Sequence, residues 1–125
     1  MMGVDMKMIT THADNGTTTL QLEGEIDLHV SPELRETLRT LAATETDTLL
    51  IDFSGVSYVD SSGLATLVEY ARLSNDYGGK MALFGLQSKV RMVFDLVRLD
   101  ELFTIADDAD SAVKLVKARG SKVAR

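Results

Sequence analysis

Three short segments hold most of the side chains that could do chemistry. They are Asp27-Leu28-His29-Val30-Ser31, Ser57-Tyr58-Val59-Asp60-Ser61-Ser62-Gly63 and Gly85-Leu86-Gln87-Ser88. Each one follows an apolar run that is typical of a β-strand. In an open α/β sheet the loops after parallel strands lie along one edge, where ligands and partners bind. The sequence therefore predicts that acids and hydroxyl groups converge at this edge.

The densest group of these side chains is Asp60-Ser61-Ser62-Gly63-Leu64, which precedes an amphipathic run. One interpretation is helix capping, because Asp and Ser oxygens satisfy the unpaired N–H groups of a first helical turn. The other is a phosphate-carrying serine, since the positive end of a helix and its free N–H groups stabilise added negative charge. Both interpretations fit the residue types.

A serine hydrolase is a third hypothesis. Ser61 or Ser62 would be the nucleophile, His29 the base and Asp27 the residue that orients it. The sequence disfavours this, because neither serine has a glycine two residues before it, as a nucleophile elbow requires. We therefore expect a protein that is not an enzyme.

Composition excludes several other classes of site. The 125 residues include no cysteine and two histidines, so a thiolate site or a three-histidine metal site is excluded. The glycines match neither a phosphate-binding loop nor a dinucleotide fingerprint, and we expect no cofactor. A formal net charge of -6 makes nucleic acid and anionic membranes unfavourable partners. Without a signal peptide or spanning segment, we expect a cytoplasmic protein.

Hydrophobic periodicity predicts the strands and helices that would hold these segments in place. Asn15-Gly16 predicts a type I′ hairpin turn between the first two strands, and Ser31 and Pro32 predict the capped start of the first helix. Leu64, Leu67 and Val68 mark the core side of the second helix. We expect strands at 6–12, 17–26, 48–53, 80–86 and 103–105, and helices at 31–42, 62–77, 87–96 and 107–117.

This order predicts a single α/β domain over residues 1–125, with an N-terminal antiparallel hairpin followed by a mostly parallel sheet. The crossover helices are expected on one side of the sheet. Residues 1–5 and about 118–125 are expected to be disordered tails.

Four segments carry a resemblance to a known family. They are Gly24-Glu25-Ile26-Asp27, Ser31-Pro32-Glu33-Leu34-Arg35, Leu50-Ile51-Asp52-Phe53-Ser54-Gly55-Val56 and Asp60-Ser61-Ser62-Gly63-Leu64. In this order they resemble the STAS-domain family of bacterial anti-sigma factor antagonists. Several family members have a proline near the start of the third helix, where this chain has Leu86-Gln87-Ser88. The resemblance covers nearly the whole chain and implies a STAS-like (SpoIIAA-like) fold.

The resemblance also implies a phosphorylation-controlled binding switch that regulates transcription. The second serine of Asp-Ser-Ser-Gly, which is Ser62, would receive phosphate from an anti-sigma factor that is an ATP-using serine kinase. A PP2C-type phosphatase would reset it. The unphosphorylated form would bind the anti-sigma factor and release the sigma factor. The partner-binding residues are expected to be Asp27, Ser31, Ser57, Asp60, Ser61 and Gly63.

One alternative within the family stays open. Some branches use the fold as a non-phosphorylated scaffold in signalling or lipid-transport complexes. The serine at position 62 disfavours this alternative.

Overall fold

A computed structural model describes residues 6–119, together with their side chains up to residue 117. The tails expected at 1–5 and 120–125 lie outside the described residues, whereas residues 118 and 119 still belong to the last helix. The elements are β1 (Lys7–His12), β2 (Thr17–Ile26), α1 (Ser31–Ala43), β3 (Thr48–Val59), α2 (Ser61–Asp76), β4 (Lys80–Phe84), α3 (Ser88–Leu96), β5 (Thr104–Ala106) and α4 (Ala109–Arg119).

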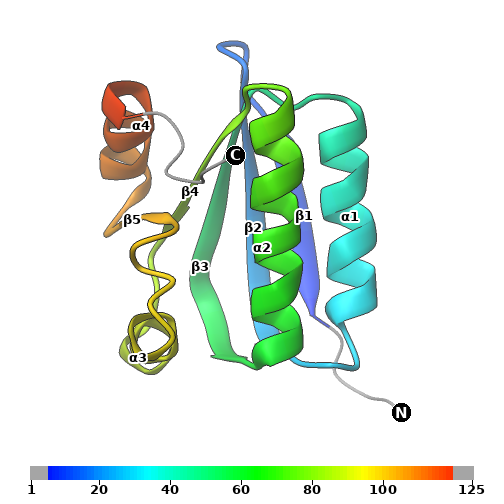
Figure 1. Ribbon diagram of the computed structural model, residues 1–125, viewed down its shortest axis with the longest axis vertical. Helices are drawn as coiled ribbons and strands as arrows, with labels where there is room; N and C mark the ends of the chain where they lie inside the picture. The colour runs from blue at the N-terminus through cyan, green and yellow to red at the C-terminus, as the bar shows by residue number, and fades with distance from the viewer. Residues whose placement is uncertain (1–5, 120–125) are drawn as a thin grey trace.

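The five strands form one sheet in the order β1-β2-β3-β4-β5. β1 pairs antiparallel with β2, and every later pair is parallel. The predicted mixed, mostly parallel sheet with an N-terminal hairpin is thereby confirmed. Because β2 to β5 are parallel, the loops that leave β2, β3 and β4 meet at one edge, at the lower end of the sheet in Figure 1.

The helices cover both faces of the sheet, and the expectation of helices on one side is wrong for α4. Leu49 and Ile51 of β3 pack with residues of α1, α2 and α3, whereas Leu50 packs with Ala112 and Val116 of α4. Right-handed crossovers place the helices between successively added parallel strands on the same face. No strand of the sheet follows α4, so this rule leaves α4 free to cover the opposite face.

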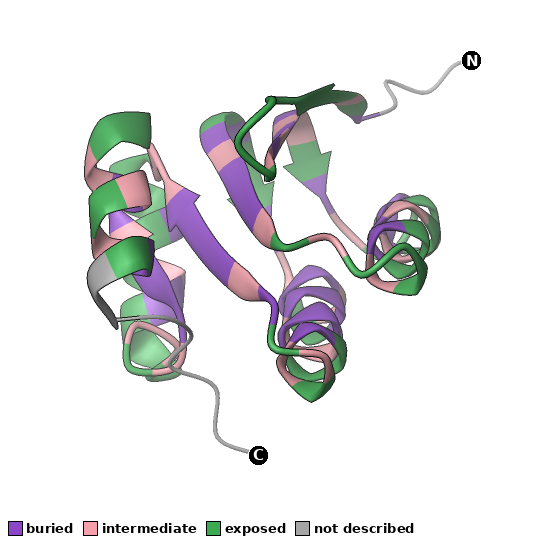
Figure 2. Cartoon of the chain, turned by 90° about the horizontal axis from the view of Figure 1, so that it is seen from above, coloured by how far each residue is buried: buried purple, intermediate pink, exposed green. Residues whose placement is uncertain are grey.

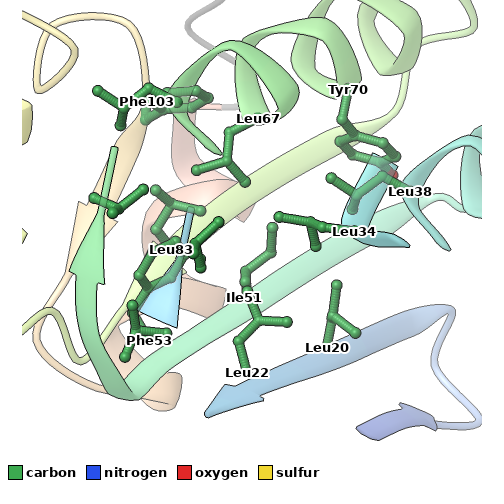
Figure 3. Packing of buried hydrophobic residues seen from close by; sticks show 14 of the residues in the cluster. Leu20, Leu22, Leu34, Leu38, Ile51, Phe53, Leu67, Tyr70, Leu83 and Phe103 are labelled. Carbon is green, nitrogen blue, oxygen red and sulfur yellow. The ribbon is translucent and has the colours of Figure 1, made fainter. Parts of the chain in front are cut away.

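The main core lies between the sheet and α1 to α3. Leucine and isoleucine side chains of β2 and β3 face Leu34 and Leu38 of α1 and Leu67 of α2 (Figure 3). The rings of Phe53 and Phe94 pack edge to face with their centroids 5.9 Å apart, and those of Phe94 and Phe103 do so at 6.0 Å, which ties α3 to the sheet. Viewed from above, buried residues line the inner sides of the helices while their outer sides are exposed (Figure 2). These contacts hold the starts of α1 and α2 in fixed positions.

The hairpin turn differs from the predicted two-residue type I′ turn. Gly16 N–H donates to the carbonyl of Ala13, which places Asp14 and Asn15 at the centre of the turn. Gly16 has a φ of 85°, while Asn15 is not among the residues with positive φ. The Asn15 side chain instead accepts the N–H of Thr17 at 3.1 Å. The chain therefore uses a longer connection with only the glycine in the left-handed region.

Candidate functional site

Asp60 is the N-cap of α2 and the centre of the site. Its Oδ1 atom accepts the backbone N–H groups of Ser62 at 2.9 Å and Gly63 at 3.1 Å, and the Ser62 hydroxyl at 2.6 Å. Its backbone is extended, as a capping residue requires. The capping interpretation is thereby confirmed for Asp60. The N–H groups of Ser62 and Gly63 are bound to this carboxylate and are not free to hold a phosphate.

The same contacts fix the charge of Asp60. The hydrogen bond from the Ser62 hydroxyl holds the pKa of the Asp60 carboxyl below its ordinary value, and partial burial opposes this shift. Three backbone N–H groups, from Gly63, Ser62 and Leu28, lower the pKa further. Asp60 is therefore ionised at neutral pH and accepts hydrogen bonds on both oxygens.

The loop between β2 and α1 is fastened to this cap. The Oδ2 atom of Asp60 accepts the backbone N–H of Leu28 at 3.0 Å, and Asp60 N–H donates to the carbonyl of Ile26 at 3.0 Å. Asp27 closes the loop on itself, because its Oδ1 atom accepts the N–H groups of His29 at 2.9 Å and Val30 at 3.2 Å. The two predicted segments thus form one hydrogen-bonded unit.

Ser31 and Ser62 meet at the junction of these segments. Their Oγ atoms lie 2.7 Å apart, and the Ser31 Oγ atom is 2.8 Å from the carbonyl oxygen of Asp27. Ser31 does not cap α1, contrary to the expectation from sequence: it is the first helical residue, and Val30 holds the cap position without a side-chain bond. The hydroxyl of Ser31 is turned inward to Ser62, and only 4% of the residue is exposed.

Gly63 lets α2 begin close to the sheet. A Cβ atom at this position would lie 2.6 Å from Ile26 Cγ2 and 2.9 Å from Val59 Cγ2. Any larger residue would push the start of α2, and Ser62 with it, away from β2 and β3. Gly63 is buried, so its visible role is packing, and its contact with a partner stays a prediction.

Ser57 and Ser61 lie outside the hydrogen-bond network as described. Ser57 is not in a loop as predicted, because β3 continues to Val59 and Ser57 lies at a register irregularity opposite β2. Both serines are exposed. In the third predicted segment, Gln87 donates to the carbonyl of Ser54 at 2.9 Å, which ties the start of α3 to β3. Partner contacts at Ser57 and Ser61 stay predictions.

Leu28 is a feature that sequence reasoning did not single out. Its side chain is 74% exposed although its backbone N–H is bound to Asp60. The available signal was an apolar residue between Asp27 and His29 in an otherwise polar loop. Single exposed apolar side chains are common on protein surfaces, and Leu28 stands out because Asp60, which also holds Ser62, fixes its backbone.

The arrangement does not support the hydrolase hypothesis. Within the described residues the imidazole of His29 has no hydrogen bond to either serine, and Asp27 Oδ1 is bound to backbone N–H groups instead. The Ser62 hydroxyl contacts Asp60 and Ser31. A nucleophile, base and orienting acid are thus not assembled here.

Two hollows lie near the helix ends. One, of about 350 Å³, is lined by Gly24, Glu25, Asp27, His29 and Val30 beside the site. A larger one, of about 490 Å³, lies between the C-terminal parts of α1 and α2, remote from Ser62. In the part of the chain that the structure describes, no group of three or more His, Asp or Glu side chains could hold a metal ion. None of the helices within residues 6–119 combines the length and apolar character needed to cross a membrane.

Comparison with known proteins identifies the family. The STAS domain matches residues 8–112, which include every residue of the site just described. The chain belongs to the STAS domain family. A curated relative of this STAS domain, the anti-sigma-B factor antagonist of Bacillus subtilis (strain 168), is 33% identical over 95 residues, which make up 76% of this chain and 86% of the relative.

Solved structures show the same fold. An anti-sigma factor antagonist from Mycobacterium paratuberculosis matches with a TM-score of 0.81 at 24% identity, over 90% of this chain and 95% of that one. The Bacillus cell fate determinant SpoIIAA in its phosphorylated form matches with a TM-score of 0.68 at 22% identity, over 88% of this chain and 99% of that one. The predicted STAS-like fold is thereby confirmed.

Proposed function

We propose that this STAS domain is an anti-sigma factor antagonist whose partner binding is controlled by phosphorylation of Ser62. In the unphosphorylated form it binds an anti-sigma factor with serine kinase activity, and the sigma factor is released for transcription. The kinase supplies the bound ATP, and a PP2C-type phosphatase restores the hydroxyl. This protein acts in the cytoplasm by binding and has no catalytic activity of its own.

The observation that carries the proposal is the position of the Ser62 hydroxyl. It lies in the first turn of α2, partly exposed, with its oxygen 2.6 Å from an ionised carboxylate. The bond to Asp60 orients the hydroxyl, and a partner can approach it from the exposed side of the edge. The curated relative named as an anti-sigma-B factor antagonist supports the class of partner.

The geometry also supports a switch by charge. Phosphorylation removes the Ser62 hydroxyl proton, so the Oγ atom and Asp60 Oδ1 become two acceptors in contact. The phosphate adds about 1.5–2 negative charges at neutral pH beside the Asp60 carboxylate. A partner surface fitted to a neutral hydroxyl would then face a charge that it cannot pair, which is strongly unfavourable in an interface. The fold itself should change little, because the backbone N–H groups of Ser62 and Gly63 cap α2 through Asp60 without the Ser62 hydroxyl.

The test is phosphoryl transfer from an ATP-binding anti-sigma factor kinase of the same genome. Wild type should accept one phosphate, whereas Ser62→Ala should bind the kinase and accept none. Ser61→Ala, which removes the neighbouring exposed hydroxyl, is the matched control for the acceptor and should still accept one phosphate. Calorimetry should show that Ser62→Asp binds the kinase more weakly than wild type. A stable complex whose affinity is the same for wild type, Ser62→Asp and the phosphorylated protein would instead support the non-phosphorylated scaffold.

A further inference from the structure

Three short contacts link four oxygen atoms around Ser62. Its Oγ atom lies 2.6 Å from Asp60 Oδ1 and 2.7 Å from Ser31 Oγ, and Ser31 Oγ lies 2.8 Å from the carbonyl oxygen of Asp27. The carboxylate and the carbonyl only accept, so the two serine hydroxyls supply every proton in these contacts. Two protons can fill only two of the three contacts at one time.

The two protons will leave unfilled the contact that costs least without a proton, and this decides which hydroxyl donates to which oxygen. An empty contact between Ser62 and Asp60 brings a hydroxyl oxygen against a charged carboxylate oxygen at 2.6 Å, and it forfeits the strongest, charge-assisted hydrogen bond. An empty contact between the two serines brings two hydroxyl oxygens together at 2.7 Å with no proton between them. Both alternatives are repulsive.

Leaving the remaining contact, between Ser31 Oγ and the Asp27 carbonyl oxygen, without a proton also opposes two oxygens, but this contact is the longest of the three at 2.8 Å and its acceptor has other donors. The Asp27 carbonyl already accepts the backbone N–H groups of Val30 at 3.1 Å and Ser31 at 2.9 Å. It therefore stays satisfied without the Ser31 hydroxyl. In the favoured hydrogen-bond arrangement, Ser31 donates to Ser62 and Ser62 donates to Asp60.

This hydrogen-bond arrangement determines which lone pair of the Ser62 oxygen is free. A hydroxyl oxygen has two lone pairs, and one of them accepts the proton of Ser31. One lone pair remains for attack on phosphorus. Ser31 is buried in the first turn of α1, so its donor is held in place by the packing of α1 on the sheet. Asp60, the N-cap of α2, and Ser31, in the first turn of α1, together fix the orientation of the Ser62 oxygen.

We propose that Ser31 is a positioning residue for phosphoryl transfer to Ser62, and that its hydroxyl directs the one free lone pair of Ser62 toward the incoming phosphate. The inference rests on the proposed function, since it requires Ser62 to be the acceptor. In the transfer, that lone pair forms a bond to the γ-phosphorus of the kinase-bound ATP, and the bond from this phosphorus to the β–γ bridging oxygen breaks. ADP leaves with that electron pair, and the hydroxyl proton passes to Asp60 and then to water.

The experiment compares wild type, Ser31→Ala, Ser31→Thr and Thr11→Ala as substrates of the kinase with MgATP. Ser31→Ala should lower kcat about tenfold or more, because a misdirected nucleophile loses much of the advantage of orientation. KM and the melting temperature should stay at their wild-type values, since Ser31 is buried and the Asp27 carbonyl keeps its backbone donors. Ser31→Thr restores the hydroxyl and should restore kcat. Thr11→Ala, which removes an exposed hydroxyl on β1 at the hairpin end of the sheet, should match wild type.

Four results would overturn the proposal. Ser31→Ala with wild-type kcat removes the positioning role, and Ser31→Ala that changes KM alone makes residue 31 a determinant of docking. A Ser31→Thr variant that melts like wild type but transfers as slowly as Ser31→Ala shows that the hydroxyl is not the active feature. Wild type that accepts no phosphate overturns the proposed function and this inference with it, so the two failures are distinguishable.

Discussion

The backbone N–H of Leu28 donates to the Oδ2 atom of Asp60 at 3.0 Å, and this bond fastens the tip of the β2–α1 loop to the residue that caps α2. The other oxygen of the same carboxylate holds Ser62. The exposed side chain of Leu28 and the partly buried hydroxyl of Ser62 are therefore held in fixed relation to each other by one carboxylate.

Truncation of Leu28 should weaken partner binding without weakening the fold. Leu28→Ala is expected to raise the Kd for the anti-sigma factor about tenfold, as the loss of an apolar anchor in an interface does. Leu73→Ala is the matched control, because Leu73 is also exposed but lies on α2 three turns from Ser62. Calorimetric titration of both variants measures the effect. Equal affinities of Leu28→Ala and wild type would contradict Leu28 as an anchor.

Substitution of Asp60 should change how stability depends on pH. Folding lowers the pKa of the Asp60 carboxyl, so its ionised form stabilises the native state at pH values above the ordinary carboxyl pKa of about 4. This contribution is lost as pH falls through the lowered pKa of the folded state. Asp60→Asn keeps a capping oxygen but no charge. Urea unfolding should show wild type more stable than Asp60→Asn at neutral pH, with a difference that shrinks below about pH 4. A difference independent of pH would contradict this.

Truncation in the core should have the opposite signature to truncation of Leu28. Leu67 is fully buried between α2 and the sheet, and Leu67→Ala should cost about 2–5 kcal/mol of unfolding free energy through a cavity. Leu96 is 76% exposed on α3, and Leu96→Ala should stay within about 0.5 kcal/mol of wild type. Denaturant unfolding of the pair tests the assignment of faces. Similar losses in both variants would contradict it.

Gly63→Ala should destabilise the protein although alanine is the better helix former. The gain in helix propensity is about 1 kcal/mol, whereas forcing a Cβ against Ile26 and Val59 costs about 1–3 kcal/mol. Ser61→Ala, two residues earlier at an exposed position, should stay within about 0.5 kcal/mol. Thermal melting of the two variants is the measurement. A rise in melting temperature for Gly63→Ala would show that α2 has room to move from the sheet.

The sequence predicts the order of elements and the residues that cap α2, because periodicity and capping are local properties of the chain. Asp60 is recognised in this way. The contact between Ser31 and Ser62 is not, since the two residues are 31 positions apart and each also fits a local role at a helix start. The extension of β3 past Phe53 was missed because its last residues are buried only at Val56 and Val59, on one face. The place of α4 was missed because no crossover constrains it.

The strand order β1-β2-β3-β4-β5 means that each strand is joined to a neighbour already present when it emerges from the ribosome. Each new strand is therefore added at the same edge of the sheet, beside the strand that precedes it in the sequence. β2, α1, β3 and α2 complete the hydroxyl and carboxylate cluster before β5 and α4 are made. The cluster therefore lies wholly in the N-terminal part of the chain, and the last helix covers the face of β3, β4 and β5 that α1, α2 and α3 leave open.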